Sequence, residues 1–229
     1  KEYGVLSAFA RGAKKPRGRL TSSTELFCYS RFVLFSGRDA LTVDKAEAEN
    51  TFFALREDLD KLAYASYFAQ LAAELAPKEE PAPEQLRLML NLLHFLAEGS
   101  RPPLLLKAVA ELRLLCLGGY MPDLVACQGC GRYEGEGMAF FPVSGRLLCG
   151  GCRQGGEAAG EEGIELSPGV LGAMRYIVYS EFDKLFSFSL GEENLRRLAE
   201  VCQRYLLCQL DRRFDSLDFL LSLGAGAPV

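Results

Sequence analysis

Two closely spaced pairs of cysteines most strongly limit what this chain can fold into. Cys127 and Cys130 form one C-x2-C pair, Cys149 and Cys152 form a second, and 18 residues separate the pairs. Each pair can place two thiolates on one turn, and a predicted hairpin at 138–149 brings the turns together around a tetrahedral ion. Because soft sulfur ligands favour zinc over magnesium or calcium, we expect one zinc ion per chain.

Free thiols or a redox pair are the alternatives for these cysteines. The chain carries no recognisable export signal, so we expect a reducing, cytoplasmic environment in which paired cysteines indicate metal rather than disulfides. Four thiolates would fill the coordination shell and leave no position for water, which favours a structural role over a catalytic one. The other cysteines lie among apolar residues, and we expect them to be reduced core residues: Cys28, Cys116, Cys202 and Cys208.

The charge of the chain is unevenly distributed. The whole sequence carries a net charge of −4, but residues 1–20 hold +5, so the remainder holds −9. A basic segment on an acidic protein indicates a local contact with a polyanion. The candidate contacts lie on a glycine- and proline-rich loop: Arg11, Lys14, Lys15, Arg17 and Arg19. A solvated loop without a ligand is the alternative, and we expect Phe9 and Phe27 to be core residues rather than stacking platforms.

The order of elements predicts an α+β protein. Residues 1–46 have the composition of short strands joined by turns, including a hairpin at 36–39 and a returning strand at 40–43, which favours a small barrel. From about residue 47 the apolar residues recur at helical spacing, with breaks at 77–83, at Gly99 and at 118–119. Further helices are predicted from Ser167 to about 180 and from 192 to 214.

Several classes of function are disfavoured. The chain has one histidine, and it lacks a Walker loop and a nucleophile-elbow motif. Its longest apolar stretch, 104–125, is interrupted by Lys107, Glu111, Arg113 and Asp123, so we expect no membrane association. We therefore expect no enzymatic activity, and we retain a zinc-dependent nucleic-acid hydrolase as the alternative. If the loop cations bind no DNA, the arginine pairs 196–197 and 212–213 are the next candidates.

Several segments in order resemble one known family. Residues 4–20 (GVLSAFARGAKKPRGRL) are similar to a strand and loop of the bacterial RecO family of DNA repair proteins. Residues 55–67 (LREDLDKLAYASY) resemble the start of its helical domain, and 104–122 its central helix and exit turn. The cysteine pairs follow where zinc-bearing members carry theirs, and 210–220 (LDRRFDSLDFL) resemble its closing segment.

This resemblance implies a specific organisation and activity. It implies an N-terminal OB-fold at 1–46, with its first strand missing, and a helical domain at 47–229 with a zinc-binding insert at 127–152. The family's members are recombination mediators that bind single- and double-stranded DNA, anneal complementary strands and help load RecA. The implied partners are RecR and the single-stranded-DNA-binding protein, and the implied location is the bacterial nucleoid. A zinc-stabilised scaffold that binds proteins without contacting DNA is the alternative.

Overall fold

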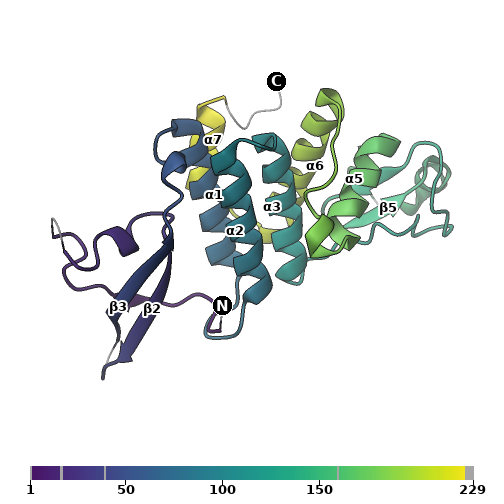
Figure 1. Cartoon of the computed structure of the whole chain (residues 1–229). Helices are drawn as coiled ribbons and strands as arrows, with labels where there is room; N and C mark the ends of the chain where they lie inside the picture. Colours follow the sequence, from purple (N-terminus) through teal and green to yellow (C-terminus); the bar gives the residue numbers. More distant parts are fainter. Residues whose placement is uncertain (1, 16–17, 39, 159, 225–229) are drawn as a thin grey trace.

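The computed structural model of the chain describes residues 2–15, 18–38, 40–158 and 160–224. It is a mixed α+β structure, as predicted. A small sheet containing β2 and β3 lies at one end, helices α1 to α3 lie in the middle, and a second small sheet containing β5 lies at the opposite end (Figure 1). The predicted basic loop and the cysteine pairs are therefore at opposite ends of the molecule.

The N-terminal sheet has three strands in the order β1-β3-β2. β1 (Ala8–Phe9) is parallel to β3 (Leu41–Asn50), and β2 (Tyr29–Ser36) is antiparallel to it, so β2 lies at an edge. β3 is longer than the predicted strand at 40–43 and passes the predicted boundary at 46. Its second half contains good helix formers, but pairing with β2 overrides that local preference. The described residues form an open sheet here, and the OB-fold stays a prediction.

Three helices form the middle of the molecule, and their ends follow local capping chemistry. The first helical pattern was predicted from about residue 47, yet α1 (Leu59–Leu75) begins later, after a single 3-10 turn at Phe53–Leu55. Asp58 determines this start because its side chain accepts hydrogen bonds from the backbone N–H groups of Asp60 and Lys61. A short connection then leads to the second helix.

The second and third helices agree with the predicted breaks. α2 (Pro83–Glu98) and α3 (Pro103–Leu117) each begin with proline at the first helical position, where its missing N–H is not needed. Gly99 ends α2 in the left-handed conformation with φ of +68°, which glycine adopts without strain.

Within the described residues, the C-terminal part contains the second sheet and four further helices. The sheet has the order β5-β4-β6 and consists of β4 (Ala139–Phe141), β5 (Arg146–Leu148) and β6 (Ile164–Glu165). The helices are α4 (Gly150–Cys152), α5 (Pro168–Tyr179), α6 (Glu192–Leu210) and α7 (Asp215–Ser222), with a π-helical turn at Arg153–Glu157 and a 3-10 turn at Phe182–Lys184.

The prediction of one helix over 192–214 was wrong at its end. Asp211 adopts a left-handed conformation with φ of +45°, which stops α6 at Leu210 and allows α7 to turn back against α1.

One hydrophobic core runs through the helices into the second sheet. α3 is central: it packs against α1, α2, α5 and α6, and almost its whole circumference is buried. Phe140 of β4 and Leu148 of β5 belong to the same core cluster as Phe68 of α1. The cysteine-bearing segment is therefore continuous with the helical part. Within the described residues, no helix has both the length and the apolar character to cross a membrane.

Candidate metal centre and nucleic-acid interface

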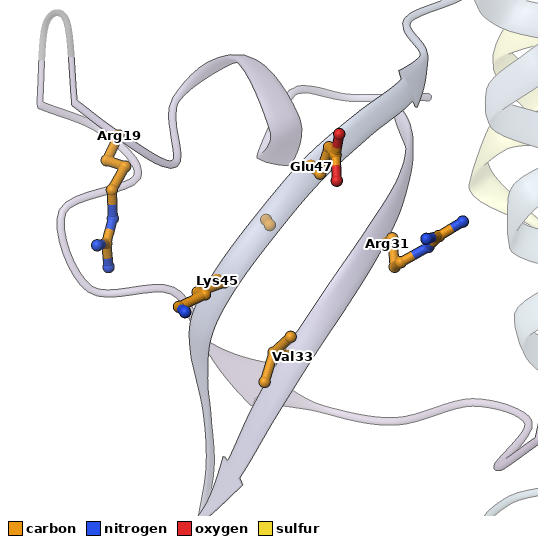
Figure 2. Close-up of a pocket in the computed structure, with 6 residues that line it drawn as sticks. Arg19, Arg31, Val33, Lys45 and Glu47 are labelled. Atoms are coloured by element: carbon orange, nitrogen blue, oxygen red, sulfur yellow. The ribbon is translucent and has the colours of Figure 1, made fainter.

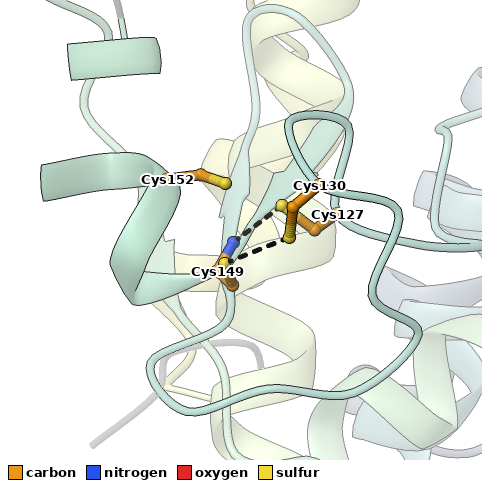
Figure 3. A group of neighbouring side chains, drawn as sticks. All are labelled: Cys127, Cys130, Cys149 and Cys152. Atoms are coloured by element: carbon orange, nitrogen blue, oxygen red, sulfur yellow. Dashed lines mark hydrogen bonds between the residues drawn. The ribbon is translucent and has the colours of Figure 1, made fainter. Parts of the chain in front are cut away.

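The four paired cysteines converge on one point. The sulfur atoms of Cys127, Cys130, Cys149 and Cys152 all lie within 4.8 Å of one another, and the Sγ atoms of Cys130 and Cys149 are 3.7 Å apart (Figure 3). Sulfur ligands about 2.3 Å from a tetrahedral zinc ion are roughly 3.8 Å apart. The donor set and its spacing therefore fit a metal ion of this kind.

Local backbone geometry sets the positions of the thiols. In the first turn, Gly131 has φ of +71° and its N–H donates to the carbonyl of Cys127 at 2.8 Å. Gly129 allows the side chain of Glu157 to lie directly against this turn, because a Cβ at position 129 would lie 1.8 Å from Oε2 of Glu157. The second pair follows β5 directly, and the N–H of Cys149 donates to the Sγ of Cys127 at 3.2 Å.

These contacts change the acidity of the thiols. Burial acts to raise the pKa of Cys127, but backbone N–H groups of Cys149, Cys130 and Gly129 donate to its sulfur and lower the pKa to about 6. The backbone N–H of Cys152 is the main group that lowers the pKa of Cys149, whereas burial raises the pKa of Cys152. The cluster thus favours thiolate at two positions, and thiolate is the form that binds metal.

The expectation for the remaining cysteines was wrong in part. Cys202 is fully buried in α6, as expected for a core residue. Cys28 and Cys116 are only partly buried, and Cys208 is exposed. α6 is amphipathic, and Cys208 lies on its outer side despite the leucines that precede it in sequence.

The basic loop is exposed and rich in unpaired charge. Arg11, Lys14 and Lys15 are exposed, and within the described ranges no carboxylate pairs with them. The guanidinium of Arg19 donates to the carbonyl of Asp44 at 3.0 Å, which ties the loop to β3. Arg17 lies outside the described residues.

The structure adds two cations that sequence reasoning missed. Arg31 of β2 and Lys45 of β3 line a shallow cleft of about 340 Å³ together with Arg19 from the loop and with Val33 and Glu47 (Figure 2). Val33 and Lys45 are direct partners across the two strands. The sequence signal was available, because Arg31–Val33 and Lys45–Glu47 are spaced to lie on one strand face. Arg31 also forms an ion pair with Glu49 at 2.7 Å.

The alternative cations on the helices are mostly neutralised. Arg197 pairs with Glu200 at 2.7 Å, and Arg196 and Arg212 pair with Glu192 and Glu74. Arg213 is exposed. These arginine pairs are therefore weaker candidates for a polyanion than the loop and cleft.

Of the two aromatic residues near the loop that were expected in the core, only Phe9 lies outside it. Phe9 is 66% exposed rather than buried, because the open sheet leaves its side of β1 uncovered within the described part of the chain. Phe27 is partly buried and packs against the core.

The fold and sites together define an α+β protein with a basic N-terminal surface and a four-cysteine centre. Two family models match the chain: "Recombination protein O N terminal" over residues 1–52 and "Recombination protein O C terminal" over 56–218. The chain therefore belongs to the RecO family, whose members are named as recombination and DNA repair proteins.

Individual relatives agree with this assignment. The DNA repair protein RecO of Acetivibrio thermocellus is 36% identical over 223 residues, covering 97% of this chain and 87% of the relative. RecO of Symbiobacterium thermophilum is 35% identical over 226 residues, covering 97% and 88%. RecO of Desulfitobacterium hafniense is 32% identical over 217 residues, covering 94% and 78%.

Proposed function

We propose that this chain is a recombination mediator that binds single- and double-stranded DNA, anneals complementary strands and helps load RecA in recombinational repair. The observation that carries the proposal is the set of exposed cations on the basic loop and the adjoining N-terminal sheet of a RecO-family chain: Arg11, Lys14, Lys15, Arg19 and Lys45. RecR and the single-stranded-DNA-binding protein are the proposed protein partners. The proposed repair reaction would take place on the bacterial nucleoid.

The chemistry of the cluster suits a sequence-independent contact. Lysine and arginine bind phosphates, which positions a protein on DNA without identifying bases. Val33 and Ala46 line the cleft together with the cations Arg19, Arg31 and Lys45, so the cleft offers both charge and apolar surface to a nucleic-acid strand. We propose that this sheet is the DNA-binding part of an OB-fold.

The four-cysteine centre is proposed to hold one structural zinc ion. Cys127, Cys130, Cys149 and Cys152 supply four thiolates, a set that leaves no ligand position for substrate. When bound, zinc would offset half of the charge of the four thiolates and join the first turn to α4. We therefore propose that the chain has no catalytic centre, in contrast to a zinc-dependent hydrolase.

Fluorescence anisotropy on labelled single-stranded DNA across a salt series tests the DNA site. On single strands the logarithm of affinity falls with the logarithm of salt by about 0.7 per phosphate contact. The triple variant Lys14→Ala/Lys15→Ala/Lys45→Ala should therefore flatten the slope by about 2 units if all three side chains engage. Annealing of complementary strands should slow in parallel.

A matched triple variant controls for net charge. Arg196→Ala/Arg197→Ala/Arg212→Ala removes the same charge from cations that already contact carboxylates. It should leave the salt slope unchanged. If the loop variant keeps the wild-type slope and annealing rate, the DNA site is elsewhere; if the wild type binds no DNA, the scaffold alternative is correct.

A further inference from the structure

A hollow that the proposed function does not use lies beside the cysteine cluster. It has a volume of about 780 Å³ and lies between the loop at 133–138 and the outer face of α5. The face consists of Pro168, Leu171, Gly172 and Arg175, which recur at helical spacing. Leu166 and Met138 complete its apolar lining.

Arg175 and Tyr133 form a ridge along one border of this hollow. The guanidinium of Arg175 donates to the carbonyls of Leu124 at 2.7 Å, Val125 at 3.1 Å and Tyr133 at 2.6 Å. Its Cζ atom also lies 3.8 Å from the ring centroid of Tyr133. Arg175 therefore holds the tyrosine in place by stacking and by anchoring its backbone, which lowers the entropy that this tyrosine would lose when a partner binds.

The ridge separates the hollow from a second one. The second hollow has a volume of about 510 Å³ and shares Tyr133, Gly172 and Arg175 with the first. Tyr133 is 57% exposed and Val125 is 56% exposed, and both line the second hollow. Exposed tyrosine beside arginine and apolar side chains is the composition of protein-binding surfaces.

The charge of the hollow restricts the partner. Glu134, Glu136 and Glu165 line it, and Arg175 is the only cation among its lining residues in the described part of the chain. The donors of Arg175 are directed to carbonyls, so they do not neutralise these carboxylates. Glu165 contacts Arg153 at 3.5 Å, whereas no ion pair involves Glu134 or Glu136 within the described ranges.

We propose that this hollow is the docking site for a short segment of a partner protein that carries an apolar side chain next to lysine or arginine. The apolar side chain would lie against the exposed Pro168 and Gly172, above Leu166 and Leu171, which are 6% and 4% exposed and form the floor of the hollow. The cation would face Glu134 and Glu136 at the rim. These carboxylates repel phosphates, so the site takes a basic peptide and not nucleic acid.

Selection of displayed random peptides on the full chain, followed by anisotropy with the enriched peptides, tests the proposal. We expect an enriched motif of one large apolar residue within a few positions of lysine or arginine. The variant Glu134→Gln/Glu136→Gln should weaken binding by about tenfold, as for two rim charge pairs, and the loss should shrink in high salt. The matched control Glu79→Gln/Glu80→Gln removes the same charge from the α1–α2 connection and should leave binding unchanged.

Gly172 provides a second, steric test. A Cβ there meets no atom within 4 Å, and the residue lies inside α5, so a side chain can be added without disturbing the fold. Gly172→Phe should abolish peptide binding, and Gly172→Ala should retain it. Enrichment of acidic peptides, absence of any enrichment, or equal binding by Gly172→Phe would overturn the proposal. DNA affinity should be the same in all these variants, which separates this test from that of the DNA site.

Discussion

A buried ion pair between α3 residues should make the stability of this chain depend on two side chains jointly. Lys107 and Glu111 are almost completely buried, and Lys107 Nζ lies 2.7 Å from Oε1 of Glu111. Tyr67 of α1 donates to the same oxygen at 2.7 Å, and Lys107 donates to Gln203 of α6 at 2.8 Å. The network therefore connects three helices of the core.

The expected cost of breaking the pair follows from its burial. Removing one partner of a buried pair leaves the other charge without compensation, at about 3–5 kcal/mol. Both Lys107→Met and Glu111→Gln should therefore lower the free energy of unfolding by that amount. Two charges about 4 Å apart interact by roughly 4 kcal/mol at an effective dielectric constant near 20. The double variant should consequently lose no more than either single variant.

The pH dependence distinguishes the two single variants. Burial raises the pKa of Glu111 above its usual 4.5, while Lys107 and Tyr67 act in the opposite direction. Above pH 4.5 the folded carboxyl then binds a proton more readily than the unfolded one, so this group makes stability fall as pH rises. Lys107→Met removes the cation that lowers the pKa of Glu111. The pH range over which stability falls therefore becomes wider. The penalty of Lys107→Met should be largest at neutral pH and should shrink toward pH 4.5.

Urea unfolding followed by circular dichroism measures these effects at several pH values. Glu111→Gln has no carboxyl to titrate here, whereas the wild type loses stability at this site as pH rises, so the penalty of Glu111→Gln should shrink from pH 4.5 to pH 7. The reasoning is refuted if the single losses add in the double variant, since additivity means that the two charges do not interact. It is also refuted if the penalty of Lys107→Met is independent of pH.

Three further predictions concern capping, thiol access and metal. Asp58→Ala should lower the free energy of unfolding by about 1 kcal/mol, because two N–H groups of α1 lose their acceptor; a change below about 0.3 kcal/mol in urea unfolding would contradict the cap. Cys208 should react quickly with a thiol reagent in the native protein and Cys202 only on unfolding, because burial raises the pKa of the latter; mass spectrometry of labelled peptides would detect the reverse order. Cys130→Ser should lower metal content and thermal stability together, and elemental analysis that finds no metal in the wild type purified without chelator would exclude the centre.

The sequence was sufficient to predict those structural features that depend on local chemistry. Glycine and proline at helix ends predicted α2 and α3 well, because their backbone preferences act without tertiary contacts. The spacing of the cysteines predicted that the two pairs lie together, and the structure places their four sulfur atoms in one cluster. The short hairpin between the pairs leaves few other positions for the second pair relative to the first.

Features that depend on pairing between distant segments were less predictable. The second half of β3 has the composition of a helix, and only its partner β2 makes it a strand. The residues Arg31 and Lys45 line one cleft for the same reason, because strand register places them on the same face of the sheet. The left-handed Asp211 that divides the last two helices carries no strong signal, because aspartate adopts that conformation only where packing favours it.

Within the described residues β2 lies at a sheet edge, and this position has a consequence for the chain in concentrated solution. The strand reads YSRFVLFS, so Arg31 is its single charged residue, and Phe35 is 67% exposed. An apolar edge without proline, glycine or lysine offers backbone hydrogen-bonding groups to any other extended chain. Arg31, the one charged residue of the strand, is already paired with Glu49, so little charge opposes association. The chain should therefore self-associate through intermolecular β-pairing of this strand as protein concentration rises.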